Sequence, residues 1–168
     1  MTESVADQPH RPVAVVTGGS RGLGLALTST LAGRGWRVVI DARDAARLAD
    51  AVAGLPEGAI TAVPGDVADP AHRRALADAA DAAGGARLLV NNASVLGPSP
   101  QPRLADYPLD ELEHVYAVNT LAPLALAQLL LAAEFAHRVR WVRPSDHDHL
   151  CGWCCQPSAS SMACTDRA

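Results

Sequence analysis

The chain has 168 residues, a net charge of −4 and a hydrophobic fraction of 49%. This length fits one domain with a substantial core, and the composition is that of a soluble globular protein. The negative net charge gives no electrostatic reason to expect a nucleic-acid partner. Residues 1–12 lack the apolar core of a signal peptide, and no apolar run reaches the roughly 18 to 20 uninterrupted residues of a membrane span. We therefore expect a cytoplasmic protein without a membrane or nucleic-acid partner.

Strand and helix patterns alternate along residues 13–136, which we take as one domain after a disordered segment of residues 1–12. The last predicted helix should contain an irregularity near Asn119 and Pro123, because proline cannot donate a backbone hydrogen bond. Alternation with short connections favours a parallel sheet with helices on both faces, a doubly wound α/β fold. The predicted strands cover residues 13–17, 37–41, 60–63 and 88–90, and the predicted helices cover residues 23–32, 45–53, 70–83 and 109–136.

A glycine-rich turn, Thr17-Gly18-Gly19-Ser20-Arg21-Gly22-Leu23-Gly24, follows the first predicted strand and opens the first predicted helix. Gly18 allows a tight turn off the strand, Gly22 lets the backbone approach a phosphate, and Gly24 lets the helix pack closely on the sheet. Free N–H groups at the start of the helix attract an anion. The turn therefore predicts a dinucleotide site that includes Thr17, Gly18, Ser20, Arg21, Gly22, Leu23 and Gly24.

The spacing of these glycines resembles the short-chain dehydrogenase/reductase family, and three later segments match that family in the same order. Gly65-Asp66-Val67 resembles the segment with the adenine-contacting aspartate, Asn91-Asn92-Ala93 resembles the Asn-Asn-Ala-Gly signature, and Asn119 resembles the asparagine of the catalytic tetrad. The resemblance implies a Rossmann-type fold and an NAD(P)-dependent oxidoreductase that acts on a small carbonyl or alcohol. It also implies homo-oligomers for intact members, and cofactor contacts from Asp66, Val67, Asn91, Asn92 and Ala93.

Each later match has an alternative explanation that needs no cofactor. Asn91 and Asn92 are common turn residues at strand ends, and Asp66 could be a turn or cap residue. Asn119 could bond to the backbone of its own helix at a kink. Ser94 stands where the signature has glycine, which tightens the turn without removing binding. The ordered set of four matches favours the nucleotide site over these alternatives.

Charged residues near the second predicted strand bear on the choice between NADP and NAD. The resemblance implies that NADP-dependent members place basic residues where Arg21 and Arg43 stand, to meet the 2′-phosphate. Members that prefer NAD place an acidic residue where this chain has Ala42. Asp41 and Asp44 lie nearby in sequence and would oppose an additional phosphate. We expect NADP as the cofactor, with NAD as the alternative, and the alternative for Arg43 is a solvated surface charge.

The tyrosine and lysine that the resemblance implies for catalysis are missing, since the chain contains no lysine. In the family, a lysine four residues after the tyrosine lowers the pKa of the phenol and holds the ribose. Tyr107 and Tyr116 have Glu111 and Thr120 at that distance, and both precede Asn119 instead of following it. A phenol with its ordinary pKa of about 10 is a poor base at neutral pH without such a cation. We therefore expect weak cofactor binding and no turnover.

The last segment, residues 137–168, has no helix or strand period and predicts an unstructured tail. Ser145 is a weak candidate for the catalytic serine, because its neighbours do not match the family. We hypothesise a frame shift near residues 132–138. Codons ending in C or G for residues 146–155, read one nucleotide later, encode Thr-Thr-Thr-Thr-Ser-Ala-Ala-Gly-Ala-Ala. This product resembles the family's fifth strand with its catalytic serine, so the hypothesis makes the chain a truncated or frame-shifted member.

A genuine tail would offer a different function. His147, His149, Cys151 and Cys154 could supply nitrogen and thiolate ligands for a tetrahedral zinc ion, but their spacing is compressed and has no second half. We therefore predict no metal site. The function that the sequence favours is a short-chain oxidoreductase that is inactive as written. The alternatives are a catalytically silent dinucleotide-binding protein and, behind it, a zinc-binding tail module.

Overall fold

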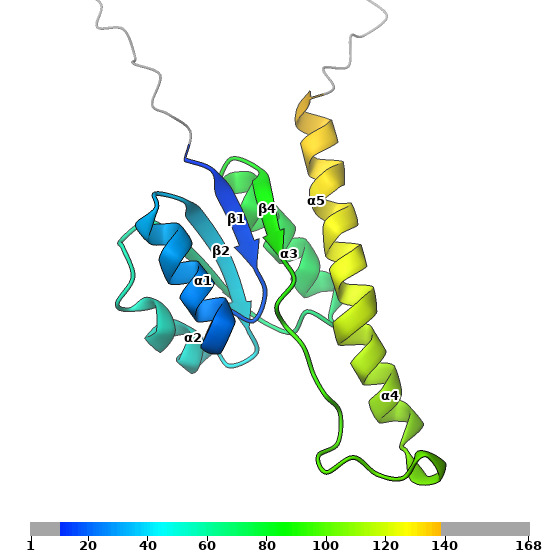
Figure 1. Cartoon of the computed structure of the whole chain (residues 1–168). Helices are drawn as coiled ribbons and strands as arrows, with labels where there is room; N and C mark the ends of the chain where they lie inside the picture. The colour runs from blue at the N-terminus through cyan, green and yellow to red at the C-terminus, as the bar shows by residue number, and fades with distance from the viewer. Residues whose placement is uncertain (1–10, 139–168) are drawn as a thin grey trace, which may run out of the picture. The chain divides into compact units, whose positions relative to one another are not determined.

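A parallel four-stranded sheet forms the centre of the protein in the order β3-β2-β1-β4 (Figure 1). The computed structural model describes residues 11–138, which belong to one compact unit. Val16 of β1 pairs with Ile40 of β2 on one side and with Val90 of β4 on the other. The chain therefore runs outwards from β1 to β3 and then returns to the opposite side of β1. The strands are β1 (Val13–Val16), β2 (Arg37–Ala42), β3 (Ile60–Pro64) and β4 (Ala86–Val90).

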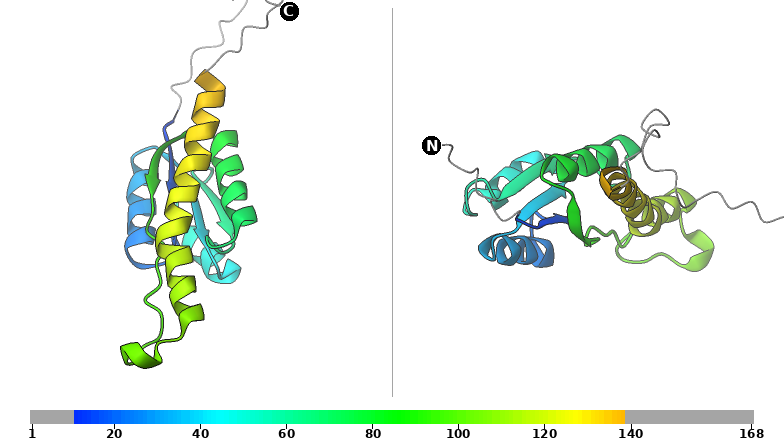
Figure 2. Two further views of the ribbon diagram at one scale, coloured as in Figure 1. Left: turned by 90° about the vertical axis from the view of Figure 1, so that its right-hand side faces the viewer. Right: turned by 90° about the horizontal axis from the view of Figure 1, so that it is seen from above.

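Helices cover both faces of this sheet, with α1 on one face and α3 and α5 on the other (Figure 2). This arrangement confirms the doubly wound α/β fold that the alternating pattern predicts. Proline at the first turn and the Asp69 cap start α3 where the sequence places it. The helices are α1 (Gly22–Gly33), α2 (Ala45–Val52), α3 (Pro70–Ala82), the 3₁₀ helix η1 (Leu104–Asp106), α4 (Leu109–Tyr116), the π-helix η2 (Ala117–Leu121) and α5 (Ala122–Arg138).

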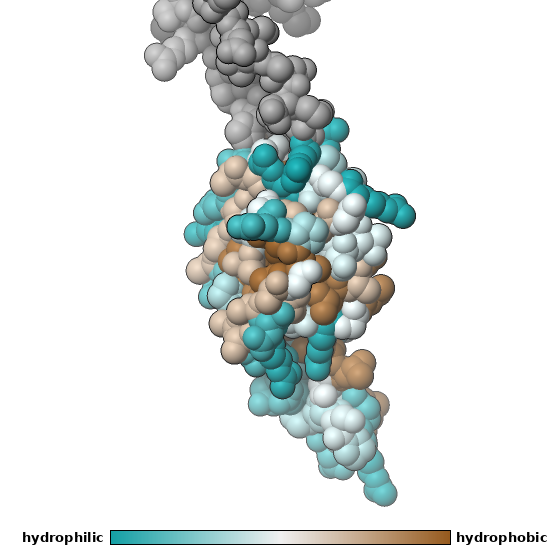
Figure 3. All heavy atoms as spheres, turned by 90° about the vertical axis from the view of Figure 1, so that its left-hand side faces the viewer, coloured by the Kyte–Doolittle hydropathy of each residue, from teal (hydrophilic) through white to brown (hydrophobic). Residues whose placement is uncertain are grey.

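Two apolar cores lie on opposite faces of the sheet, because successive side chains of a strand point to opposite sides. All four residues of β1 are buried, as expected for a central strand of a parallel sheet. On the side of the molecule with α1 and α2, Figure 3 shows an apolar centre bordered by hydrophilic residues. One core consists of Ala14, Val16, Ala32, Val38, Ile40, Leu48 and Ala59, and the other of Val13, Val15, Val39, Leu76, Ala80 and Leu126.

The long helical segment is interrupted at the predicted place. Pro123 has no backbone N–H, so the carbonyl of Asn119 lacks its ordinary α-helical donor. The backbone widens there into the π-helix η2, and single-turn π-segments of this kind are frequent at functional sites. The irregularity also carries Val118 and Asn119 into contact with the loop after β4.

The continuous helix from Leu109 to Ala133 is long and apolar enough, by length and composition alone, to cross a membrane. The apolar run after Leu121 would by itself be too short to cross a membrane, but α4 and η2 lengthen the helix. A helix that packs against the core of a domain passes the same test. This one packs in part, because α5 contacts α3 and β4 and its Leu126 is fully buried against the sheet, while 17% of the apolar window is buried.

Candidate functional site

A cavity of about 380 Å³ opens at the carboxyl ends of the strands. It lies where the strand order reverses beside β1, which is the position at which open parallel sheets bind ligands. Residues from four connections, those after β1, β2, β3 and β4, meet there. The lining residues are Gly18, Ser20, Arg21, Gly22, Asp41, Ala42, Arg43, Asp44, Arg47, Gly65, Asp66, Val67, Asn92, Ala93, Ser94, Val95 and Val118.

The glycine-rich turn forms one wall of the cavity. Gly18 and Gly22 have positive φ values of 70° and 54°, which side chains other than glycine rarely adopt. Helix α1 begins at Gly22, its N-cap residue Arg21 makes no side-chain capping bond, and its first turn contains no acidic residue. The first N–H groups of this helix therefore remain without a side-chain acceptor, and such a helix start binds anions.

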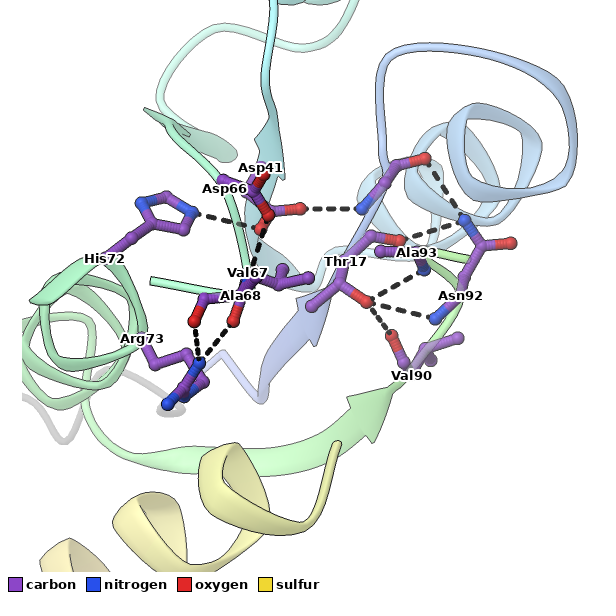
Figure 4. A network of polar contacts seen from close by, with 11 residues as sticks. Thr17, Asp41, Asp66, Val67, Ala68, His72, Arg73, Val90, Asn92 and Ala93 are labelled. Carbon is purple, nitrogen blue, oxygen red and sulfur yellow. Dashed lines mark hydrogen bonds and ion pairs between the residues drawn. The ribbon is translucent and has the colours of Figure 1, made fainter. Parts of the chain in front are cut away.

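Thr17 and Asn92 join the glycine turn to the end of β4 (Figure 4). The hydroxyl oxygen of Thr17 accepts hydrogen bonds from the backbone N–H groups of Asn92 and Ala93, both at 3.0 Å. The side-chain amide of Asn92 donates to the carbonyls of Thr17 at 2.9 Å and Gly18 at 3.1 Å. Thr17 and Asn92 thus hold two walls of the cavity together, and Thr17 itself is buried below them.

The loop after β3 forms a second wall and places Asp66 and Val67 on the cavity. The Asp66 carboxylate accepts the N–H of Ala68 at 2.9 Å, so the turn role considered from the sequence is also present. Arg73 of α3 donates to the carbonyls of Val67 at 2.6 Å and Ala68 at 2.9 Å. These bonds fix the loop from behind and leave its cavity side to a ligand.

Asp41, at the end of β2, is a site residue that the sequence analysis did not select. Its carboxylate accepts the N–H of Gly18 at 2.6 Å and lies 3.1 Å from Nε2 of His72, and the residue is almost fully buried. Burial raises the pKa of the Asp41 carboxyl, and the bonds from Gly18 and His72 oppose that rise. One sequence signal could have marked Asp41. It is an aspartate near the end of an apolar strand, β2, and β2 pairs with the strand that leads into the glycine turn.

Three arginines, Arg21, Arg43 and Arg47, bring positive charge to the cavity. Arg47 forms an exposed ion pair of 3.4 Å with Asp44, which also caps α2. Within residues 11–138, neither Arg21 nor Arg43 has a carboxylate partner. The part of the cavity after β2 is therefore suited to an anionic group.

Besides the buried Thr17 and the tightly packed Gly24, three predicted site residues do not line this cavity. Leu23 is two-thirds exposed on the outside of α1, and Asn91 is exposed beside a smaller void. Asn119 does not bond to its own helix. Its side chain accepts the N–H of Val95 at 3.0 Å and donates to the Val95 carbonyl at 2.8 Å. Asn119 therefore touches the site only through Val95, which does line the cavity.

Gly24 also lies outside the lining, and its place in the motif is explained by packing. A Cβ atom there would overlap the carbonyl oxygen of Gly18 and lie 2.6 Å from the Asn92 amide. The close approach of α1 to the sheet that the sequence predicts is therefore observed at this residue.

Neither tyrosine lines the cavity. The Tyr107 hydroxyl is close to Gly97, and Tyr116 is exposed. In residues 11–138 no cluster of three or more metal-ligating side chains occurs. The tail candidates Ser145, His147, His149, Cys151 and Cys154 lie outside the described residues, as does most of the hypothetical frame-shifted segment.

Comparison with known proteins identifies the family. A model of the short chain dehydrogenase family matches residues 12–138. The chain belongs to this family. It is 36% identical over 157 residues to an NADPH-dependent aldehyde reductase-like chloroplastic protein of Arabidopsis thaliana, and the match covers 83% of this chain and 56% of the relative. The short-chain dehydrogenases of known structure show the same fold.

Two solved structures illustrate the structural similarity. L-sorbose reductase from Gluconobacter frateurii, solved with NADPH and L-sorbose, has a TM-score of 0.68 and 30% identity, covering 76% of this chain and 49% of that one. The 3-oxoacyl-[acyl-carrier protein] reductase from Brucella melitensis, solved with NAD, has a TM-score of 0.65 and 31% identity, covering 81% and 54%. This chain spans about half the length of the curated relatives that it matches.

Proposed function

We propose that residues 11–138 form the cofactor-binding part of an NADP-dependent short-chain dehydrogenase that acts on a small carbonyl or alcohol. The observation that carries the proposal is the cavity at the strand-order reversal, which has the start of α1 on one wall and two arginines without carboxylate partners beside it. A nicotinamide bound there would donate or accept the hydride. The protein residues bind and orient that cofactor.

The residues present fit a dinucleotide. We assign the pyrophosphate to the first turn of α1, where Gly22 has open space around its Cα. The adenine is assigned to the wall with Asp66 and Val67, and the nicotinamide ribose to the wall with Ala93 and Ser94. Asn119 orients this last wall through Val95. The family resemblance implies that it would also organise a proton relay in the complete reaction.

The charges after β2 support NADP over NAD. Asp41 turns its carboxylate inwards to Gly18 and His72, so it does not present a free acceptor to a ribose hydroxyl. Ala42 is uncharged, and Arg21 and Arg43 border the same space. A 2′-phosphate would therefore meet two cations.

We expect the purified chain to bind NADPH more tightly than NADH, measured by quenching of tryptophan fluorescence or by calorimetry. Arg43→Ala should weaken NADPH binding about tenfold, since a charge-assisted bond to phosphate is lost, and should leave NADH binding nearly unchanged. Arg74→Ala, at an exposed arginine of α3 outside the cavity lining, is the control. Equal losses for both cofactors in Arg43→Ala would contradict a 2′-phosphate contact.

A second candidate function is silent dinucleotide binding, which needs the cavity but no proton donor. On this alternative, the chain binds NADPH and does not oxidise it. The test is the absorbance of NADPH at 340 nm with a panel of small aldehydes and ketones. Substrate-dependent loss of absorbance would show that another group supplies the proton and would reject the silent alternative.

A further inference from the structure

A buried pair of titratable side chains, Asp41 and His72, lies beside the glycine turn and contacts it through the N–H of Gly18 (Figure 4). Nε2 of His72 lies 3.1 Å from one carboxylate oxygen of Asp41, and the other oxygen accepts the Gly18 N–H at 2.6 Å. The His72 side chain is only 6% exposed and the Asp41 side chain only 2%. A chain of contacts therefore links α3, through β2, to the turn where we place the pyrophosphate.

The surroundings hold the imidazole in place. A Cβ atom at Gly65 would overlap the His72 ring, so glycine at this position makes room for it. Arg73, the next residue of α3, directs its guanidinium to the carbonyls of Val67 and Ala68. Asp66, from the loop after β3, is the other ionisable group whose charge acts on Asp41. His72 therefore faces Asp41 from α3, and Asp66 adds negative charge from the β3 side.

The charge of this pair depends on one proton. When carboxylate and imidazole together hold that proton, the pair is neutral, and when the proton is lost to solvent the pair carries one negative charge directly behind the Gly18 N–H. A pyrophosphate on the neighbouring N–H groups is anionic, and a buried negative charge nearby opposes it.

We propose that the Asp41–His72 pair takes up a proton when a dinucleotide binds to the glycine turn, and that His72 is a positioning residue for the cofactor. The proposal rests on the proposed function, because it requires dinucleotide binding at this turn. The proton comes from solvent, and no covalent bond is made or broken. Binding and proton uptake are linked reciprocally, so affinity should rise as pH falls through the titration of the pair.

The experiment compares NADPH affinity across about pH 5.5 to 8.5, the range in which histidine ordinarily titrates. The wild-type chain should bind up to tenfold more tightly per unit fall in pH where one proton is taken up. His72→Gln keeps an N–H donor for Asp41 but does not titrate, so its pH profile should be flatter. The 2′-phosphate of NADPH also titrates near pH 6, and this contribution is the same for both proteins.

His114→Gln, which removes a histidine of α4 outside the cavity lining, is the matched control and should keep the wild-type profile. If His72→Gln also keeps that profile while both proteins bind NADPH, the positioning role is wrong and the dinucleotide site stands. If the wild-type chain binds no NADPH at any pH, the proposed function fails first. If His72→Gln does not fold, a pH titration of the imidazole proton signals of the wild-type chain by NMR is the deciding measurement. NADPH should shift the titration midpoint of the pair upwards, and an unchanged midpoint would overturn the proposal.

Discussion

Single glycines in the turn after β1 have different structural roles. Gly22 supplies a positive φ in open space, whereas Gly24 supplies room between α1 and the turn. The motif alone does not separate these roles. The atoms around each glycine separate the two roles, and they predict which substitutions the protein tolerates.

Gly24→Ala should unfold or strongly destabilise the domain, by about 2 to 3 kcal/mol, because the new methyl group overlaps the Gly18 carbonyl and the backbone must move. Gly33→Ala is the control, since a Cβ atom there meets no atom within 4 Å and alanine favours helix by up to about 1 kcal/mol. Urea unfolding of both variants measures the difference. A Gly24→Ala protein as stable as the wild type would show that α1 can move away from the turn at little cost.

The part of the site that the sequence did not reveal is the contact between Asp41 of β2 and His72 of α3. The glycine turn was predicted from its own residues, because it directly follows a strand and opens a helix, whereas Asp66, Val67 and the Asn91-Asn92-Ala93 segment were predicted from the family resemblance. The Asp41–His72 contact joins residues 31 positions apart and depends on where α3 packs. No periodicity in the sequence encodes that placement.

At the level of elements, the predicted strands and helices agree with the structure because burial patterns and caps are local. Strand β4 begins at Ala86, two residues before the prediction, since sheet pairing with Val13 extends it beyond its apolar centre. The π-helix follows from Pro123, which the sequence analysis used. The two hydrogen bonds between Asn119 and Val95 could not be predicted, because the long loop between β4 and α4 has no period that places Val95.

This pair of hydrogen bonds predicts a defined local effect of Asn119→Ala. Both hydrogen bonds are solvent-exposed, so the loss of stability should be small, about 1 kcal/mol. Hydrogen exchange of the Val95 amide should become faster, and NADPH affinity should fall several-fold because the wall with Ala93 and Ser94 loosens. Thr120→Ala, at the next exposed residue, should change neither quantity. Unchanged protection of Val95 in Asn119→Ala would contradict the positioning role.

For the molecule as a whole, the described residues leave a row of apolar side chains uncovered on the long helix. Leu121, Leu124 and Leu131 are 59%, 59% and 55% exposed, and their spacing of three and seven residues places them on one helical face. Leu126, between them, turns to the sheet and is buried. Exposed apolar side chains gathered on one helical face are a candidate contact surface.

We expect this row to bind a second copy of the chain, in keeping with the homo-oligomers that the family resemblance implies. Light scattering after size exclusion should show a dimer or larger species at micromolar concentration, and Leu124→Glu with Leu131→Glu should shift it towards monomer, because burying two carboxylates in an apolar contact is costly. Leu96→Glu changes an equally apolar and more exposed side chain on the loop before α4, outside this row, and should leave the association unchanged. A monomeric wild-type chain would mean that the row contacts something other than a second copy, whereas association that survives the double variant but not Leu96→Glu would place the contact on the loop.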